Sequence, residues 1–178
     1  FEDECLMYEN GASLFRNRGF YLLEDRPDQA EDDRPVFIVG SGPSIDDSLE
    51  VIRRWRDRVV LISAGTGLGS LLENGLRPDL HCEVENLPIL MHGIKPLHEK
   101  FDLGDIPLVS TNTIYPPIMD MFGDSLVYLR DSVLPTRLFA ETHAPLLMAG
   151  PTVVNLACRV AVALRLRNIY LFGVDLGS

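Results

Sequence analysis

The sequence contains only three cysteines, Cys5, Cys82 and Cys158, and they form no CxxC pair. This odd, widely spaced set argues against a disulfide framework or a zinc knuckle and is typical of the reducing cytoplasm, where we expect the protein. Basic residues are scarce as well, because 16 Lys and Arg stand against 26 Asp and Glu, a formal net charge of −10. The balance argues against nucleic-acid binding through an overall basic field, since a phosphate backbone requires positive charge.

Long apolar runs are also missing from the sequence. No run approaches the roughly 20 residues that a membrane-spanning helix needs, and Phe1-Glu2-Asp3-Glu4 does not begin a signal segment. We therefore expect no membrane span. The chain also lacks an initiator Met and stops just after a strand-like run, so we expect it to be a piece of a larger protein.

The acidic residues are concentrated at the front of the chain. Residues 1–34 hold 10 acidic and 4 basic residues, whereas the remaining 144 hold 16 and 12. Residues 24–34 (EDRPDQAEDDR) are charged and contain a proline, which is typical of a solvated linker. We therefore place a domain boundary near Arg34-Pro35. With 46% hydrophobic residues in 178, the composition is sufficient to bury the core of one ordinary domain.

After this boundary, short β-branched runs alternate with helical stretches. We expect strands at 36–39, 59–63, 80–84, 107–110, 126–129 and 168–172. We expect helices at 46–56, 66–74, within 89–100 and at 152–166, with a weaker helical pattern over 4–17. The runs VFIV, VVLI and IYLF are apolar throughout, which is typical of parallel strands covered on both faces. The alternation predicts an α/β fold with a doubly wound, mostly parallel, Rossmann-like sheet, truncated at its C-terminal end.

In such a sheet the ligand crevice lies beyond the carboxyl ends of the strands. The first of these ends is Gly40-Ser41-Gly42-Pro43-Ser44, where glycines allow close approach and the next helix presents N–H groups that favour a phosphate. Compatibly with this, Ser44 is expected to cap the helix with Asp47 as its capping-box partner. Ile45 replaces the third glycine of a dinucleotide fingerprint, and no GK[ST] follows, so neither that motif nor a P-loop is present.

The third strand end carries carboxylates. Alternation places His81, Glu83 and Glu85 on one face, just before Asn86. A carboxylate there binds a ligand hydroxyl, a metal or a base, or else it forms a solvated edge or pairs with an arginine. We weigh these two interpretations equally for Glu85, favour the second for Glu83, and expect His81 to be a packed or hydrogen-bonded strand histidine.

Three later segments hold further candidates. Ser110-Thr111-Asn112-Thr113 offers hydroxyls and an amide suited to a base or sugar edge, or it forms an ordinary polar turn. Gly150-Pro151-Thr152 opens an apolar helix whose start points to the same crevice as the first loop. Asn155 in that helix needs a polar partner, for which Arg159 is a neighbour one turn later. Asp175, at the last strand end, is a candidate ligand, an orienting residue or a turn cap.

Three motifs in order, VGSGPSID, GLRPDLHCEVEN and GPTVVNLACRVAVALRLRNIYLFGVDL, resemble the central domain of the bacterial motility accessory factor family. The same domain family includes the archaeal hydroxymethyl-dihydropterin diphosphokinase. The first and last motifs also resemble those of bacterial sialyltransferases. The resemblance spans about residues 35–178 and implies an incomplete, sialyltransferase-like, nucleotide-sugar-binding domain. Residues 1–34 would then be the tail of an upstream domain with its acidic linker.

The resemblance implies a glycosyltransferase that moves a nonulosonic, sialic-acid-like sugar from a CMP-activated donor to Ser or Thr hydroxyls of flagellin. Glu85 and Asp175 are the candidate catalytic residues, Mg²⁺ is a candidate cofactor, and no metal site is assigned. In the related sialyltransferases an Asn stands where this chain has Gly65, and the presumed catalytic His follows the final strand, so we expect a base beyond Ser178. The candidate donor-binding residues are Gly40, Ser41, Gly42, Pro43, Ser44, Gly65, Asn86, Thr111, Asn112, Gly150, Pro151 and Thr152.

Two other functions stay open. A Mg²⁺-dependent diphosphokinase acting on a pterin-like substrate would need carboxylates such as Glu85 and Asp175 to hold the metal, because triphosphate charge must be neutralised. A non-catalytic module that binds flagellin is the third interpretation, since the sequence shows no evident base.

Overall fold

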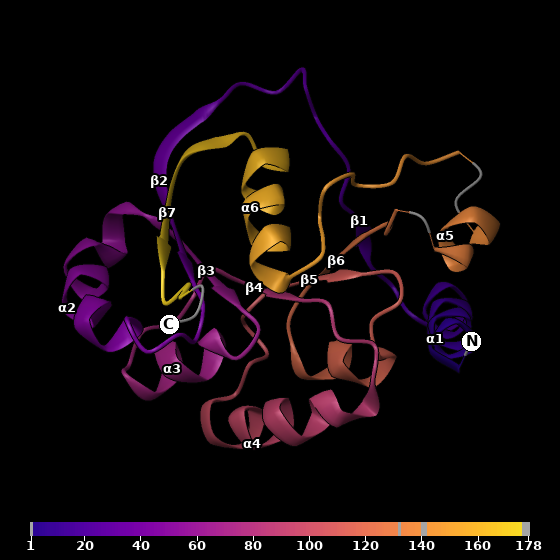
Figure 1. The fold of residues 1–178 in the computed structure, drawn as a ribbon, viewed down its shortest axis with the longest axis horizontal. Coiled ribbons are helices and arrows are strands. Elements are labelled where there is room, and N and C mark those ends of the chain that lie inside the picture. The colour runs from indigo at the N-terminus through magenta and orange to yellow at the C-terminus, as the bar shows by residue number, and fades with distance from the viewer. Residues whose placement is uncertain (1, 132, 140–141, 176–178) are drawn as a thin grey trace. The chain divides into compact units, whose positions relative to one another are not determined.

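The computed structural model describes residues 2–131, 133–139 and 142–175. The chain forms two compact units, each assembled from two separate stretches of sequence. Unit 1 comprises Phe1–Glu24 and Glu83–Met148, and unit 2 comprises Asp25–Cys82 and Ala149–Ser178. Each unit has its own parallel strands and its own covering helices (Figure 1).

The described residues of unit 2 form four parallel strands in the order β4-β3-β2-β7. The strands are β2 (Asp32–Val39), β3 (Val60–Ala64), β4 (Leu80–Glu83, whose last residue belongs to unit 1) and β7 (Leu166–Phe172). The helices are α2 (Ile45–Trp55), the short 3-10 helix η1 (Arg56–Arg58), α3 (Gly67–Glu73) and α6 (Val153–Ala163). Figure 1 shows α6 on one side of these strands and α3 on the other, so both faces of β3 are covered.

In the part of unit 1 that the structure describes, three parallel strands lie in the order β1-β6-β5. These are β1 (Tyr21–Leu22), β5 (Leu108–Thr111) and β6 (Ser125–Tyr128). The helices are α1 (Glu2–Asn17), α4 (Met91–Phe101) and α5 (Leu134–Phe139), with 3-10 helices η2 (Pro88–Leu90) and η3 (Pro116–Met121). Helix α1 packs against α5 and η3, so the N-terminal residues are an integral layer of this unit.

The predicted fold class is confirmed, since every strand pairing within the two units is parallel and helices alternate with strands. The boundary predicted near Arg34-Pro35 stays a prediction, although the packing groups residues 2–24 with 83–148. Two elements were not expected, β1 and α5, because each is too short to produce a periodic pattern. Among the described residues, no helix has the length and apolarity to cross a membrane.

The apolar runs differ in how they are covered. VFIV and VVLI are buried as predicted, with Val36, Ile38, Leu61 and Ile62 all at 0% exposure. The prediction for IYLF is wrong, because Tyr170 and Leu171 are 54% and 49% exposed. Within unit 2, β7 is the outer strand and pairs with β2, so only part of it is covered. The apolar pattern of the sequence indicates how hydrophobic a strand is, but it does not indicate where that strand lies in the sheet.

Gly67, the first residue of α3, lies against the backbone at the end of β2, and this contact tests the packing of unit 2. A Cβ at Gly67 would lie 2.3 Å from the Val39 carbonyl oxygen, a backbone atom that cannot rotate away. Gly67→Ala should therefore lower the free energy of unfolding by about 1–3 kcal/mol, the usual cost of overpacking. Gly93→Ala in α4 is the matched control, since a Cβ there meets nothing within 4 Å; it should stabilise by about 0.5–1 kcal/mol. Equal effects of both in urea unfolding would contradict the packing argument.

His81 gives unit 2 a predicted pH dependence. Its ring is completely buried, its Nδ1 lies 2.9 Å from Ser63 Oγ, and burial lowers its pKa from 6.5 to about 3. The expectation of a packed, hydrogen-bonded histidine is thus confirmed. Below pH 6.5, His81 binds a proton in the unfolded chain but stays neutral in the folded chain. The free energy of unfolding should therefore fall as the pH drops from about 6.5 towards 3, by up to about 1.4 kcal/mol per pH unit.

Urea unfolding of the wild type and of His81→Gln between pH 4 and 7 measures this effect. The difference in unfolding free energy between the two proteins should shrink as the pH falls, because Gln has no proton to gain. Comparing the two proteins cancels other titrations, including that of Glu83, whose raised pKa acts in the opposite direction. A difference that stays constant over this range would refute the assignment.

Candidate functional site

The loop after β2 is held against the end of β7 by direct backbone contacts. The Gly42 N–H donates to the Gly173 carbonyl over 2.8 Å, and the Gly40 N–H donates to the Phe172 carbonyl over 2.9 Å. A Cβ at Gly40 would lie 2.6 Å from the Gly173 oxygen, and one at Gly42 would lie 2.9 Å from it. The two glycines therefore allow the strand ends to meet, which is a structural reason for their presence beside any role in binding.

The side chain of Asp175, which follows β7, lies at the N-terminal end of α2. Its Oδ2 accepts the Ser44 N–H over 3.1 Å, and a Cβ at Gly42 would lie 2.0 Å from the same oxygen. The Ile45 N–H already donates to the Gly42 carbonyl over 3.0 Å. The predicted capping box of Ser44 is not formed, because the Ser44 side chain makes no cap hydrogen bond. The carboxylate of Asp175 takes that place, so an anion reaching this helix end would have to compete with it.

The loop after β3 joins the first loop to the start of α6. Ser41 Oγ and Thr66 Oγ1 are 2.5 Å apart, so one hydroxyl donates to the other. Gly65 has a φ of +54°, and a Cβ there would lie 3.2 Å from Val153 Cγ1 in the first turn of α6. Residues 40–44, 65–67 and 152–153 therefore line one end of unit 2, as expected for segments at the carboxyl ends of parallel strands.

Helix α6 begins with a capping box. Thr152 Oγ1 accepts the Asn155 N–H over 3.3 Å, and Asn155 Oδ1 accepts the Thr152 N–H over 3.3 Å. Asn155 thus finds its partner in Thr152, and the expected neighbour Arg159 instead pairs with Asp25. The first turn contains no acidic residue, and among the described residues the N–H groups of Val153 and Val154 have no acceptor. This helix end is therefore more open to an anion than that of α2.

The remaining donor-loop candidates of unit 2 lie at its surface. Gly150, Pro151 and Thr152 are all exposed, and a Cβ at Gly150 would meet no atom within 4 Å. Pro43 and Ser44 are exposed as well. Unit 2 as a whole contains the predicted residues Gly40, Ser41, Gly42, Pro43, Ser44, Gly65, Gly150, Pro151, Thr152 and Asp175. Their binding role stays a prediction.

In unit 1, the polar residues after β5 are buried and bonded within the protein. Thr111 and Asn112 both have 0% exposure. The Asn112 amide donates to Thr136 Oγ1 over 3.1 Å, and its Oδ1 accepts the Arg130 N–H over 2.9 Å. Through these hydrogen bonds, Asn112 holds the segment after β6 and the start of α5 in place, which is a structural role. A role of Thr111 and Asn112 in reading a base or sugar stays a prediction.

The carboxylates at and just after the end of β4, also in unit 1, accept hydrogen bonds from their own backbone. Glu83 is 6% exposed, and its Oε1 accepts the N–H groups of Val84 and Glu85 over 2.8 and 3.2 Å. Burial raises the pKa of Glu83, although these two hydrogen bonds oppose the shift. Glu85 Oε1 accepts the Leu87 N–H over 3.0 Å. Both carboxylates therefore act as local caps here, and catalysis by Glu85 stays a prediction.

Asn86 differs from its neighbours because its side-chain Nδ2 is buried and has no hydrogen-bond partner among the residues that the structure describes. Its carbonyl accepts Asn10 Nδ2 over 2.9 Å, and the same nitrogen of Asn10 donates to the Thr113 carbonyl over 3.1 Å. Asn10, 5% exposed in α1, thus joins the segments at Asn86 and Thr113 within unit 1, and the sequence analysis missed it. Its spacing of four residues from Leu6 and Leu14 on one helix face was the available signal.

No three His, Cys, Asp or Glu side chains gather into a metal-binding group anywhere in the described part of the chain. The two candidate catalytic residues fall in different units, Glu85 in unit 1 and Asp175 in unit 2. A role for Mg²⁺ stays a prediction, and in unit 2 the backbone N–H groups at the start of α6 can donate hydrogen bonds to an anion.

Comparison with known proteins relates this arrangement to a family. The family model described as "6-hydroxymethylpterin diphosphokinase MptE-like" matches residues 7–178. The structure of the MAf glycosyltransferase from Magnetospirillum magneticum AMB-1 matches with a TM-score of 0.93 and 40% sequence identity, covering 99% of this chain and 28% of that chain. No curated protein matches the chain.

The two matches differ in how much of each protein they cover. The family model begins at residue 7, within α1, and therefore includes residues that the motif resemblance did not reach. The chain corresponds to little more than a quarter of the glycosyltransferase that it matches, since it covers 28% of that protein. The chain therefore belongs to the MptE-like family, and it is similar over nearly its whole length to one part of a MAf glycosyltransferase.

Proposed function

We propose that this chain is the donor-binding part of a glycosyltransferase and that it holds the CMP moiety of an activated sugar in unit 2. The observation that carries the proposal is the meeting of three loops at one end of that unit. Ser41 bonds to Thr66, and Gly65 lies against Val153, so the loops after β2 and β3 and the start of α6 border one another. The match to a MAf glycosyltransferase supports the same assignment.

The phosphate of the donor is best placed at the start of α6. That helix has no acidic residue in its first turn, and two of its N–H groups have no acceptor in the part of the chain that the structure describes. Helix α2 is less suited, because Asp46 and Asp47 stand in its first turn and Asp175 already accepts the Ser44 N–H. An anion gains from unpaired N–H groups and from the positive end of the helix dipole. Charge therefore favours α6 as the principal phosphate contact.

The chemistry required of such a site is the departure of a phosphate. The bond between the anomeric carbon of the sugar and the phosphate oxygen breaks, and CMP leaves with the electron pair. The acceptor hydroxyl oxygen forms the new bond to that carbon, and its proton passes to a base. Fixed N–H groups at α6 would stabilise the negative charge that develops on the leaving phosphate.

The finer assignments rest on the motif resemblance. A nonulosonic sugar as the transferred group, and flagellin Ser or Thr hydroxyls as acceptors, are the proposals that follow from the motility accessory factor motifs. Glu85 and Asp175 are proposed for acceptor-side roles. The protein named MAf glycosyltransferase supports sugar transfer in general.

A second function is supported by the description of the family model. The MptE-like family is named for a 6-hydroxymethylpterin diphosphokinase, and its model matches residues 7–178. That activity would transfer a diphosphate from a nucleoside triphosphate, with Mg²⁺ neutralising the charge. It requires carboxylates that face the triphosphate, and of the candidates in unit 2 only Asp175 supplies one.

Ligand-induced stabilisation distinguishes the two functions. CMP alone should raise the melting temperature, because a ligand that binds only the folded state stabilises it by about 2.7 kcal/mol at 100 times its Kd. The measurement is a thermal-shift series with CMP, CDP and ATP, each with and without Mg²⁺. A shift that requires both ATP and Mg²⁺ would favour the diphosphokinase, and the absence of any shift would favour a non-catalytic module.

Asp175 provides a test of the electrostatic argument. Asp175→Asn keeps an oxygen that can accept the Ser44 N–H but removes the negative charge beside the loops. Without Mg²⁺, the Kd for CMP should therefore fall by about two- to fivefold, the size of an exposed charge effect near a helix end. Titration calorimetry measures it, and Glu50→Gln, which removes an exposed charge from α2 beyond its first turn, is the control. A weaker affinity in Asp175→Asn would show instead that the carboxylate helps to bind the donor.

A further inference from the structure

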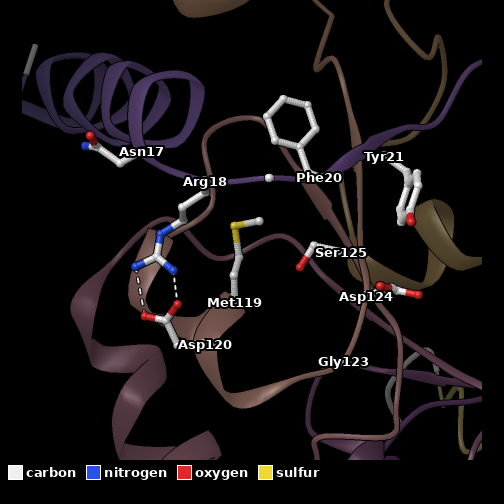
Figure 2. A pocket seen from close by; sticks show the side chains of 10 residues that line it. Asn17, Arg18, Phe20, Tyr21, Met119, Asp120, Gly123, Asp124 and Ser125 are labelled. Atoms are coloured by element: carbon white, nitrogen blue, oxygen red, sulfur yellow. Dashed lines mark hydrogen bonds and ion pairs between the residues drawn. The ribbon is translucent and has the colours of Figure 1, made fainter.

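Unit 1 contains a cavity that the proposed function does not use. Its volume is about 500 Å³, and it is formed by the α1–β1 connection, η3 and the turn that leads into β6 (Figure 2). It is lined by Asn17, Arg18, Gly19, Phe20, Tyr21, Met119, Asp120, Gly123, Asp124 and Ser125. We refer to this set as the α1–β6 pocket.

The α1–β6 pocket lies at the amino ends of its strands. Tyr21 is the first residue of β1, and Ser125 is the first residue of β6. The candidate residues Thr111 and Asn112 lie at and just after the carboxyl end of β5, which runs parallel to β6. The pocket and those candidates are therefore at opposite ends of the same three strands, so the pocket is a separate site within unit 1.

The charged side chains that line the α1–β6 pocket include an ion pair within the protein. Arg18 forms a two-point ion pair with Asp120, in which Nη2 donates to Oδ2 over 2.8 Å and Nη1 donates to Oδ1. Asp124 adds a second carboxylate, so the lining carries one positive and two negative charges. Anions such as phosphates and sugar acids are disfavoured there, because the only lining guanidinium already has its counter-ion.

The remaining lining chemistry combines an apolar surface with donors and acceptors. The Tyr21 side chain is 64% exposed, and Figure 2 shows it with Asp124 on one side of the pocket and the Arg18–Asp120 pair on the other. Met119 and Ser125 lie between these two sides in that view. Carboxylate oxygens accept hydrogen bonds, and the guanidinium and the Ser hydroxyl donate them. A planar aromatic ring provides an apolar surface at little conformational cost.

We propose that the α1–β6 pocket is a binding site for a neutral carbohydrate, separate from the proposed CMP site. A sugar ring presents hydroxyls that donate to Asp120 and Asp124 and accept from Arg18, while its C–H face packs on Tyr21. Because a carbohydrate of this kind carries no charge, the net negative lining does not repel it. The proposal stands on the pocket alone and does not depend on the proposed donor.

The test uses saturation-transfer NMR on the intact protein with methyl α-glucopyranoside, methyl α-mannopyranoside and N-acetylglucosamine as probes. At least one of these sugars should give a saturable signal, with a Kd on the order of 1 mM, as is usual for a small ligand with few contacts. Addition of CMP should leave this signal unchanged. Lysine methyl ester, included as a cationic competitor, should not displace the sugar.

Two variants of the pocket and one matched control complete the experiment. Tyr21→Leu removes the aromatic ring but keeps an apolar side chain, and Asp124→Asn removes a charge without a change of size. Each should weaken sugar binding about tenfold, which is the loss of one good contact. Tyr170→Leu changes a similarly exposed tyrosine in unit 2 and should leave binding intact.

The effects of the variants and of the competitors on sugar binding decide whether the α1–β6 pocket is the binding site. Binding that is lost in Tyr21→Leu or Asp124→Asn and kept in Tyr170→Leu supports the site. Binding that both pocket variants leave unchanged would overturn it, as would displacement of the sugar by CMP or by lysine methyl ester. The absence of a signal with all three sugars would overturn it as well, and the thermal-shift result with CMP would be unaffected by that failure.

Discussion

The candidate site depends on the close approach of backbone to backbone at the ends of β2 and β7. Gly40 and Gly42 lie against the Gly173 carbonyl, and Gly67 lies against the Val39 carbonyl. A side chain at Gly40 or Gly67 would fall well inside contact distance of a backbone atom, so the loops could not occupy their present positions. The glycines that look like ligand-binding residues in the sequence are therefore first of all residues that let the strand ends meet. Any ligand uses a surface that this packing has already fixed.

Electrostatics then distinguishes helix ends that look alike in the sequence. Both α2 and α6 begin after a glycine-containing loop, and both present N–H groups at the same end of unit 2. The acids in the first turn of α2, together with Asp175, satisfy its positive end from within the protein. The first turn of α6 has a Thr–Asn capping box and no acid. In a chain with a net charge of −10, a helix end that its own carboxylates leave open is a distinctive place for an anion.

The sequence predicted the alternation of strands and helices because buried parallel strands are apolar runs of defined length. The run VFIV shows this, since its four residues are buried in the centre of unit 2. It could not predict that IYLF lies in an outer strand, because hydrophobicity does not report the neighbours of a strand. It also could not assign the partners of Asn112 and Asp175, since a polar residue at a strand end has the same pattern whether it binds a ligand or the backbone. Those partners, Arg130 and Ser44, are distant in sequence and close only after folding.

The hydrogen bonds of Asn10 show what the N-terminal residues contribute to unit 1. Its single amide nitrogen serves the carbonyls of Asn86 and Thr113, and the strand that follows α1 supplies β6 with a neighbour. A protein trimmed to Pro35 would leave those two carbonyl oxygens and one side of β6 without their hydrogen-bond donors. The first helix consequently supplies hydrogen bonds on which the backbone of unit 1 depends.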